Sequence, residues 1–156
     1  MQKRGLQLAF GFIFSIILIA AILFVSFYAI SKFSGVKKCT EGALFYENFQ
    51  ERIDSAWRSE IVKDVFSERV SSGIKEVCIG ELSNLEEKYR ILEDYSFSGG
   101  NVFMWPPEKA CEDFASHKIE HIGFENSGIK CFTVVNGRVE IPIEKGSTDA
   151  LVMIRR

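Results

Sequence analysis

The chain has 156 residues, with 19 basic and 21 acidic side chains and a formal net charge of −2. Gly5 to Ser31 carry no charge, so the apolar residues are concentrated near one end rather than spread through a core. Lys3 and Arg4 precede this stretch, which leaves 17 basic against 21 acidic side chains for the rest of the chain. That acidic balance argues against a nucleic-acid partner, because phosphate binding requires basic surface.

Residues 6–31 are predicted to form a transmembrane helix behind a basic leader, residues 1–5. From Leu6 to Ile30, 21 of 25 residues are apolar. As a helix they span roughly 37 Å, enough to cross a hydrocarbon core of about 30 Å. A secretory signal peptide has a shorter apolar core of about 7 to 15 residues, followed by a cleavage site of small residues. We therefore expect a retained anchor in contact with membrane lipid.

Small or polar residues recur every four positions within this helix, at Gln7, Gly11 and Ser15, and so lie along one face. Such a stripe lets two helices approach closely and form hydrogen bonds where lipid offers no partner. It predicts a homo-oligomer or a helical bundle. The alternative is chance placement of three tolerated residues.

The residues KRG, followed by LQLAFGFIFSIILIAAILF, resemble the class III signal of archaeal type IV pilin-like proteins. In that family a short basic leader ends in Gly, a membrane peptidase cuts after it, and the apolar helix is kept as the assembly stem. The resemblance covers about the first 30 residues, and it implies cleavage between Gly5 and Leu6 and pilin-like partners for the helix. The simpler interpretation is that Lys3 and Arg4 only fix the amino terminus inside.

The side of the membrane that holds the remaining residues is decided by the cysteines rather than by the flanking charges. Lys3, Arg4 and the amino terminus are matched by three lysines after the span, at positions 32, 37 and 38. The chain has four widely spaced cysteines, Cys39, Cys78, Cys111 and Cys131. They include no C-x-x-C motif, and their even number fits two disulfides in an oxidising compartment. We expect a single-pass protein of the cell membrane with its domain outside.

After a juxtamembrane linker at residues 32–40, residues 41–156 are predicted to form an extracytoplasmic α+β domain. Its fold class is one or two helices packed on an antiparallel sheet of four or five strands. The first helix, residues 41–59, has an apolar face made of Phe45, Phe49, Ile53, Ala56 and Trp57. Glycine in a helix interior costs about 1 kcal/mol relative to alanine, so whether the two helices are continuous depends on Gly35 and Gly42. We expect at least a bend near Ser34 and Gly35.

A second helix is predicted at 83–95, begun by a capping box of Ser83 and Glu86. Its apolar face consists of Leu85, Tyr89, Leu92 and Tyr95. Residues 60–70 are ambiguous between helix and strand. Short runs of β-forming residues predict strands at 74–79, 101–105, 118–124 and 150–155.

Asn136 and Gly137 are typical of a two-residue type I′ hairpin turn. The register would pair Val134 with Val139 and Phe132 with Ile141, all on one face. Four cysteines permit three pairings, and sequence alone does not choose among them. Placement of Cys131 on the opposite face of this hairpin favours Cys111–Cys131, which leaves Cys39 with Cys78.

Candidate chemistry is sparse in this sequence. His117 and His121, with Cys111 and Cys131, give four residues of types that zinc binds, but in no common zinc-finger spacing. Ordinary histidines are the alternative. Adjacent carboxylates, Glu86–Glu87, Glu93–Asp94 and Glu112–Asp113, do not face each other on a helix and so predict solvated surface rather than a catalytic pair. Trp105, before Pro106 and Pro107, is either a docking edge or a packed side chain.

The sequence contains no G-x-S-x-G, P-loop or G-x-G-x-x-G motif, so we expect neither an enzyme nor a bound cofactor. The expected role is structural or interactive, as a pilin-like or accessory surface subunit. A monomeric anchored binding domain is the alternative. A metal-binding domain that faces the cytoplasm is a third, because its thiols would then be reduced.

Overall fold

The computed structural model describes the backbone of residues 3–124 and 128–155, and side chains within 11–33, 35–111, 113–124 and 128–155. The chain divides into two compact units, Met1–Lys37 and Lys38–Arg156. The division falls inside the predicted juxtamembrane segment.

Helix α1 spans Lys3–Arg58 and contributes to both units. It contains both helices that the sequence predicts, at 6–31 and 41–59. The helix does not end at Gly35 or at Gly42. At Gly42 the reason is packing, since an added Cβ would lie 3.0 Å from the Cβ of Phe114. Glycine at position 42 permits a close approach between α1 and the segment around Phe114, and this contact offsets the low helix propensity of glycine.

In the first unit, the large apolar side chains between Phe12 and Phe33 are exposed, as Phe24 is at 75%. Within the described residues, α1 is the single helix long and apolar enough to cross a membrane, and its most apolar window has no buried residue. The expected transmembrane candidate is therefore confirmed at the level of length, composition and exposure.

In the second unit, the carboxyl-terminal part of α1 buries most of its apolar face. Phe45, Phe49 and Ile53 have no exposed surface. The rings of Phe45 and Phe49 pack on Phe66, with centroid distances of 5.8 and 4.9 Å. Trp57, at the end of the predicted face, is 40% exposed. The predicted amphipathic helix thus supplies one wall of the main core.

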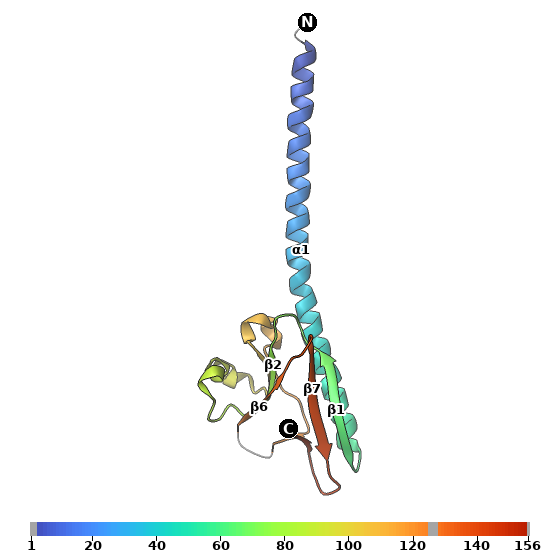
Figure 1. Cartoon of the computed structure of the whole chain (residues 1–156), viewed down its shortest axis with the longest axis vertical. Helices are drawn as coiled ribbons and strands as arrows, with labels where there is room; N and C mark the ends of the chain where they lie inside the picture. The colour runs from blue at the N-terminus through green and yellow to red at the C-terminus, as the bar shows by residue number, and fades with distance from the viewer. Residues whose placement is uncertain (1–2, 125–127, 156) are drawn as a thin grey trace. The chain divides into compact units, whose positions relative to one another are not determined.

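The first sheet has the order β1-β7-β8-β5. Its strands are β1 (Val62–Arg69), β7 (Arg138–Lys145), β8 (Val152–Ile154) and β5 (Ile122–Gly123). Figure 1 shows β1 and β7 running alongside the carboxyl-terminal part of α1. Residues 60–70, which were ambiguous, thus form an antiparallel strand, whereas β5 and β8 are parallel.

The second sheet has the order β4-β3-β2-β6 and is antiparallel throughout. Its strands are β4 (Ser116–His117), β3 (Val102–Trp105), β2 (Glu76–Gly80) and β6 (Ile129–Thr133). Two short 3₁₀ segments, η2 (Pro107–Lys109) and η3 (Glu112–Phe114), connect β3 to β4. The α+β class is confirmed, but the strands form two sheets instead of one. Of the strand predicted at 118–124, only the two residues of β5 are in a strand, and β4 lies just before that range.

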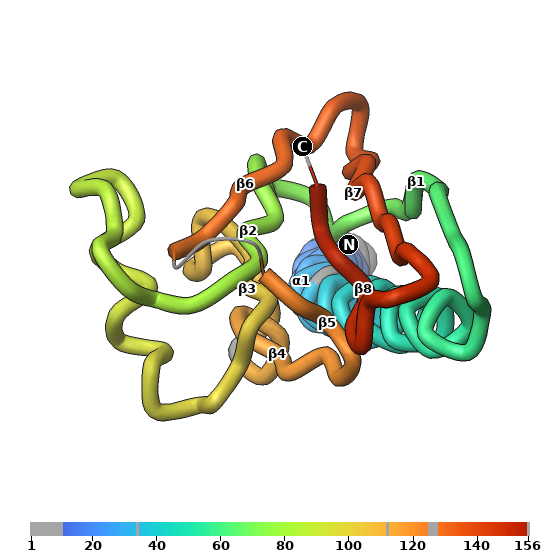
Figure 2. The backbone as a smooth tube through the Cα atoms, turned by 90° about the horizontal axis from the view of Figure 1, so that it is seen from below, coloured from blue at the N-terminus to red at the C-terminus, as the bar shows by residue number. Residues whose placement is uncertain are grey.

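The Asn136-Gly137 turn forms as predicted, with positive φ at both residues and backbone hydrogen bonds in both directions between Val135 and Arg138. The predicted pairing beyond it is wrong. The chain passes from β6 through this turn into β7 (Figure 2), and the two strands join different sheets. Val134 donates its N–H to Lys75 instead of pairing with Val139. The four apolar residues of the predicted hairpin nevertheless lie in one core.

The segment predicted as a second helix forms the 3₁₀ helix η1 (Glu87–Ser98). Its buried side follows the predicted positions, because Tyr89 and Leu92 are buried and Leu85 and Tyr95 pack against them. The capping box is wrong. Glu86 caps the helix without a side-chain hydrogen bond, and the Ser83 hydroxyl is buried without a partner among the described residues.

Candidate functional site

All four cysteines are paired, so the prediction of two disulfides is confirmed. The predicted pairing is wrong, since the bonds join Cys39 to Cys111 and Cys78 to Cys131. Cys78 and Cys131 lie directly opposite each other on β2 and β6, with their Cα atoms 3.9 Å apart. Cys39 lies one turn before Gly42 on α1, where η3 packs against the helix. Both pairings depend on contacts between residues that are far apart in the sequence, so no local sequence pattern predicts them.

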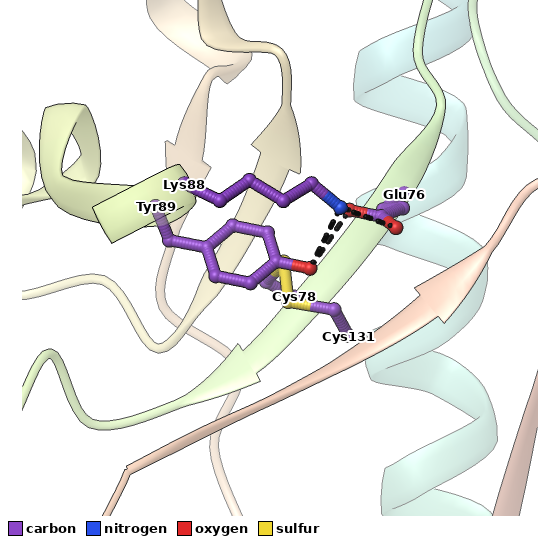
Figure 3. Close-up of a disulfide and its surroundings, with 5 residues drawn as sticks. All are labelled: Glu76, Cys78, Lys88, Tyr89 and Cys131. Atoms are coloured by element: carbon purple, nitrogen blue, oxygen red, sulfur yellow. Dashed lines mark hydrogen bonds and ion pairs between the residues drawn. A yellow bond between two sulfur atoms is a disulfide. The ribbon is translucent and has the colours of Figure 1, made fainter. Parts of the chain in front are cut away.

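Three polar side chains surround the Cys78–Cys131 disulfide (Figure 3). Glu76 lies two residues before Cys78 on β2, and alternate residues of a strand share a face. The Lys88 ammonium donates to both carboxylate oxygens of Glu76, at 2.8 and 2.7 Å, and the Tyr89 hydroxyl donates to one of them at 3.0 Å. The hydrogen bond to Glu76 raises the pKa of Lys88, so this ammonium stays charged.

The disulfide is unequally accessible from its two ends. Cys78 has no exposed surface and packs with Tyr89, Leu92 and Phe103 in a small second core. Cys131 is half-buried and lines a recess of about 180 Å³, with Tyr89 on its wall and Glu86 beside it. A reagent that reaches this disulfide therefore meets the sulfur of Cys131 first.

Trp105 closes the other side of this second core. Its ring meets Tyr89 edge to face, with centroids 5.4 Å apart, and it is half-buried. The Trp105–Pro106 peptide is cis, and Pro107 is buried at the start of η2. Trp105 is thus a packed side chain, as one of the two sequence interpretations held.

The zinc set considered from the sequence is not assembled. Cys111 and Cys131 belong to different disulfides and offer no thiolate. His117 packs its ring against Tyr46, with centroids 4.7 Å apart. His121 is bound to a carboxylate of α1 instead. The zinc hypothesis for these four residues is therefore wrong.

His121 belongs to an ordered cluster that the sequence did not indicate. Its Nδ1 lies 2.9 Å from Asp54 Oδ1, and its ring stacks on Trp57 with centroids 3.9 Å apart and planes within 6°. Gln50 donates to the same Asp54 oxygen at 2.8 Å. The hydrogen bond from His121 lowers the pKa of Asp54, so the carboxylate stays ionised. The partners are 67 residues apart, and His121 adopts a positive φ of 64°, so no local signal could have found them.

A groove of about 590 Å³ lies next to this cluster on the surface of the second unit. Glu47, Glu51 and Asp54 of α1 line one side, and Phe114 and His117 line the other. Its lining carries these three carboxylates against one cation, Arg58, and its volume is in the range of small-ligand sites.

The predicted pairs of adjacent carboxylates carry no sign of catalytic geometry in the described residues. Glu86, Glu87, Glu93 and Asp94 are all exposed at or within η1, and the side chain of Glu112 lies outside the described residues. A carboxyl pair for acid–base chemistry needs a shared cleft. The expectation of a non-catalytic protein stays a prediction.

The proposed processing site and the helix-packing stripe are only partly described. The side chains around the junction of Gly5 and Leu6, and that of Gln7, lie outside the described residues. Gly11 and Ser15 are exposed, and the Ser15 hydroxyl donates to the Gly11 carbonyl at 2.8 Å within the helix. Cleavage and helix packing both stay predictions.

No protein family, no curated protein and no solved structure matches this chain. The structure shows a long apolar amino-terminal helix and a small disulfide-bonded domain. The resemblance to pilin-like proteins therefore rests on the amino-terminal residues alone.

Proposed function

We propose that the protein is a single-pass membrane protein, with its amino terminus inside and its cysteine-bridged domain outside, and that its role is structural or interactive. The observation that carries this proposal is the contrast between an exposed apolar helix and a domain in which every cysteine is oxidised. Exposed apolar surface of this extent requires lipid or other helices. Disulfides are typical of domains outside the cytosol.

The more specific proposal is a pilin-like or accessory subunit, in which α1 is the stem that packs against other copies. It is supported by the basic residues before Gly5 and by the continuation of α1 into the core of the domain. In the stem, Gly11 and Ser15 lie on one face and permit close helix contact.

Surface labelling tests the placement of the domain. Lys63, whose side chain is 85% exposed, and the exposed Lys109 should react with an amine reagent that cannot cross the membrane, applied to intact cells. A cytoplasmic protein of the same cells, which should not react, is the control. Reaction of the domain lysines only after the membrane is opened would reverse the proposed topology.

Mass measurement of the protein from its native membrane tests the pilin-like role. Loss of Met1 to Gly5, together with crosslinked oligomers, is expected. Gly11→Leu should weaken the crosslinking because it fills the stripe, whereas Ile13→Leu, on another face of α1, should not. An intact amino terminus and a monomer would reject the pilin-like role while leaving the anchored domain in place.

In that event the alternative is a monomeric anchored binding domain. The specific observation in its favour is the acidic groove between α1 and the segment at Phe114 and His117. An anchored monomer that retains a ligand through this groove would lose it on Glu51→Lys, with unchanged membrane attachment.

A further inference from the structure

We propose that the Cys78–Cys131 disulfide, once opened by a dithiol reductant, becomes a binding site for a thiophilic divalent cation such as Zn²⁺, with Glu76 as the third ligand. This site differs from the four-residue set rejected above. Every residue involved lies in the second unit.

The ligand types and their positions carry the proposal. The sulfur atoms of Cys78 and Cys131 and a carboxylate oxygen of Glu76 all lie within 4.8 Å of one another. Two thiolates and a carboxylate are ligands that Zn²⁺ takes, and three protein ligands leave a fourth position for water. Figure 3 shows the three side chains on one side of the β2–β6 pair.

The backbone holds the ligands in place after the disulfide opens. Cys78 and Cys131 are the middle pair of a five-pair ladder that runs from Glu76–Thr133 to Gly80–Ile129. Its backbone hydrogen bonds do not depend on the sulfur–sulfur bond. The two sulfurs therefore remain facing each other, which a metal site requires of its ligands.

The recess beside Cys131 gives the reductant its route. A thiolate of the dithiol attacks the half-buried sulfur of Cys131, the sulfur–sulfur bond breaks, and Cys78 takes the electron pair as a thiolate. The second thiol of the reagent then attacks the mixed disulfide, which releases Cys131 and a cyclic disulfide. Two electrons pass to the protein, and the two cysteine thiols lose their protons to solvent when the cation binds.

Lys88 is the group that competes with the cation. Its ammonium lies within 2.8 Å of both Glu76 oxygens, so this carboxylate already holds a positive charge. The Lys88 side chain is 49% exposed and can turn into solvent. Removal of this ammonium should therefore tighten metal binding, an effect that a merely structural Glu76 would not produce.

Titration of the full chain in detergent micelles with Co²⁺, after reduction by a dithiol and removal of the excess reagent, tests the proposal. We expect a sulfur-to-cobalt charge-transfer band that is absent before reduction and is competed away by Zn²⁺. The band should persist in the chain with Cys39→Ser and Cys111→Ser, and disappear with Cys78→Ser and Cys131→Ser.

Two variants keep all four cysteines and so separate metal binding from loss of a disulfide. Glu76→Gln should weaken Co²⁺ binding by about tenfold or more, at least the effect of losing an outer-shell partner. Lys88→Met should tighten it. Near-ultraviolet circular dichroism checks the fold of each reduced chain. A reduced chain that shows no such band, an unchanged affinity in Glu76→Gln, or an unfolded reduced chain that Co²⁺ does not restore would overturn the proposal.

Discussion

The two stretches of α1 belong to one helix but differ in apolar content and in surroundings. Around Phe24 the large side chains are exposed in every direction, whereas Phe45, Phe49 and Ile53 are fully buried on one face. The first stretch has no charge over a length that spans a bilayer, and the second alternates apolar and charged residues with helical period. An uninterrupted apolar run thus distinguishes the exposed stretch, and apolar residues at helical spacing among charged ones distinguish the core-facing stretch.

Phe49→Ala should break the core-facing half most severely. Removal of a fully buried phenylalanine ring costs about 3 to 5 kcal/mol of folding free energy. Denaturant unfolding followed by tryptophan fluorescence measures it, because both tryptophans lie in the domain. Phe24→Ala, the matched control, should leave the domain transition unchanged. Equal losses in the two variants would mean that the exposed stretch also packs on the domain.

A single charge in the exposed half of α1 should weaken membrane attachment. Ile19→Lys places an ammonium near the middle of the apolar run, at a cost of about 2.5 to 3.5 kcal/mol for insertion. The fraction of chain that resists extraction from membranes should fall. Ile61→Lys, at a position that is 71% exposed in the domain, should retain full membrane attachment. Unchanged retention of Ile19→Lys would show that residues 6–31 do not span the bilayer.

Gly35 and Gly42 of α1 sharpen the same comparison. An added methyl group at Gly42 meets Phe114, whereas nothing lies within 4 Å of Gly35. Gly42→Ala should destabilise the domain by about 1 to 3 kcal/mol through overpacking, less the gain of about 1 kcal/mol in helix propensity. Gly35→Ala should not destabilise it. Thermal unfolding of both variants decides, and a stabilised Gly42→Ala would contradict the close contact.

Acid should weaken the domain slightly through Asp54. Because the His121 hydrogen bond lowers the folded-state pKa of Asp54, its contribution is present above the unfolded pKa and is lost as the pH falls through the folded pKa. The carboxylate is 35% exposed, so the effect should stay under about 1 kcal/mol. The free energy of unfolding, measured across the acidic range, should depend less on pH in Asp54→Asn. An identical acid dependence in both chains would remove this role from Asp54.

Sequence patterns predicted those elements whose signal is local. The apolar run, the amphipathic face at Phe45 to Ile53 and the Asn136-Gly137 turn all formed as expected, because each depends on spacing within about 20 residues or fewer. Strands β3 and β8 also lie within the predicted ranges, and β2 overlaps the range predicted at 74–79.

The errors share a dependence on distant partners. Val134 and Val139 have the spacing of a hairpin pair, but β6 pairs with β2 and β7 pairs with β1 instead. The pairing of β6 with β2 places Cys131 opposite Cys78, so each of these cysteines forms a disulfide with a different partner from the predicted one. The contact between His121 and Asp54 needs both α1 and the turn before β5. Register and side-chain neighbours across such separations are properties of the assembled core.

The turn that divides β6 from β7 also constrains the order in which the domain folds. Its two strands could close on each other at once, since only two residues separate the bridge residues Val135 and Arg138. The native sheets instead require contacts with β2 and β1, which are far apart from them in sequence and slow to close. During synthesis, however, β1 and β2 leave the ribosome first. When residues 129–145 leave the ribosome, β1 and β2 have already been synthesised and can pair with them. Synthesis from the amino terminus therefore favours the native pairing over the local hairpin, an advantage that is absent in refolding from denaturant.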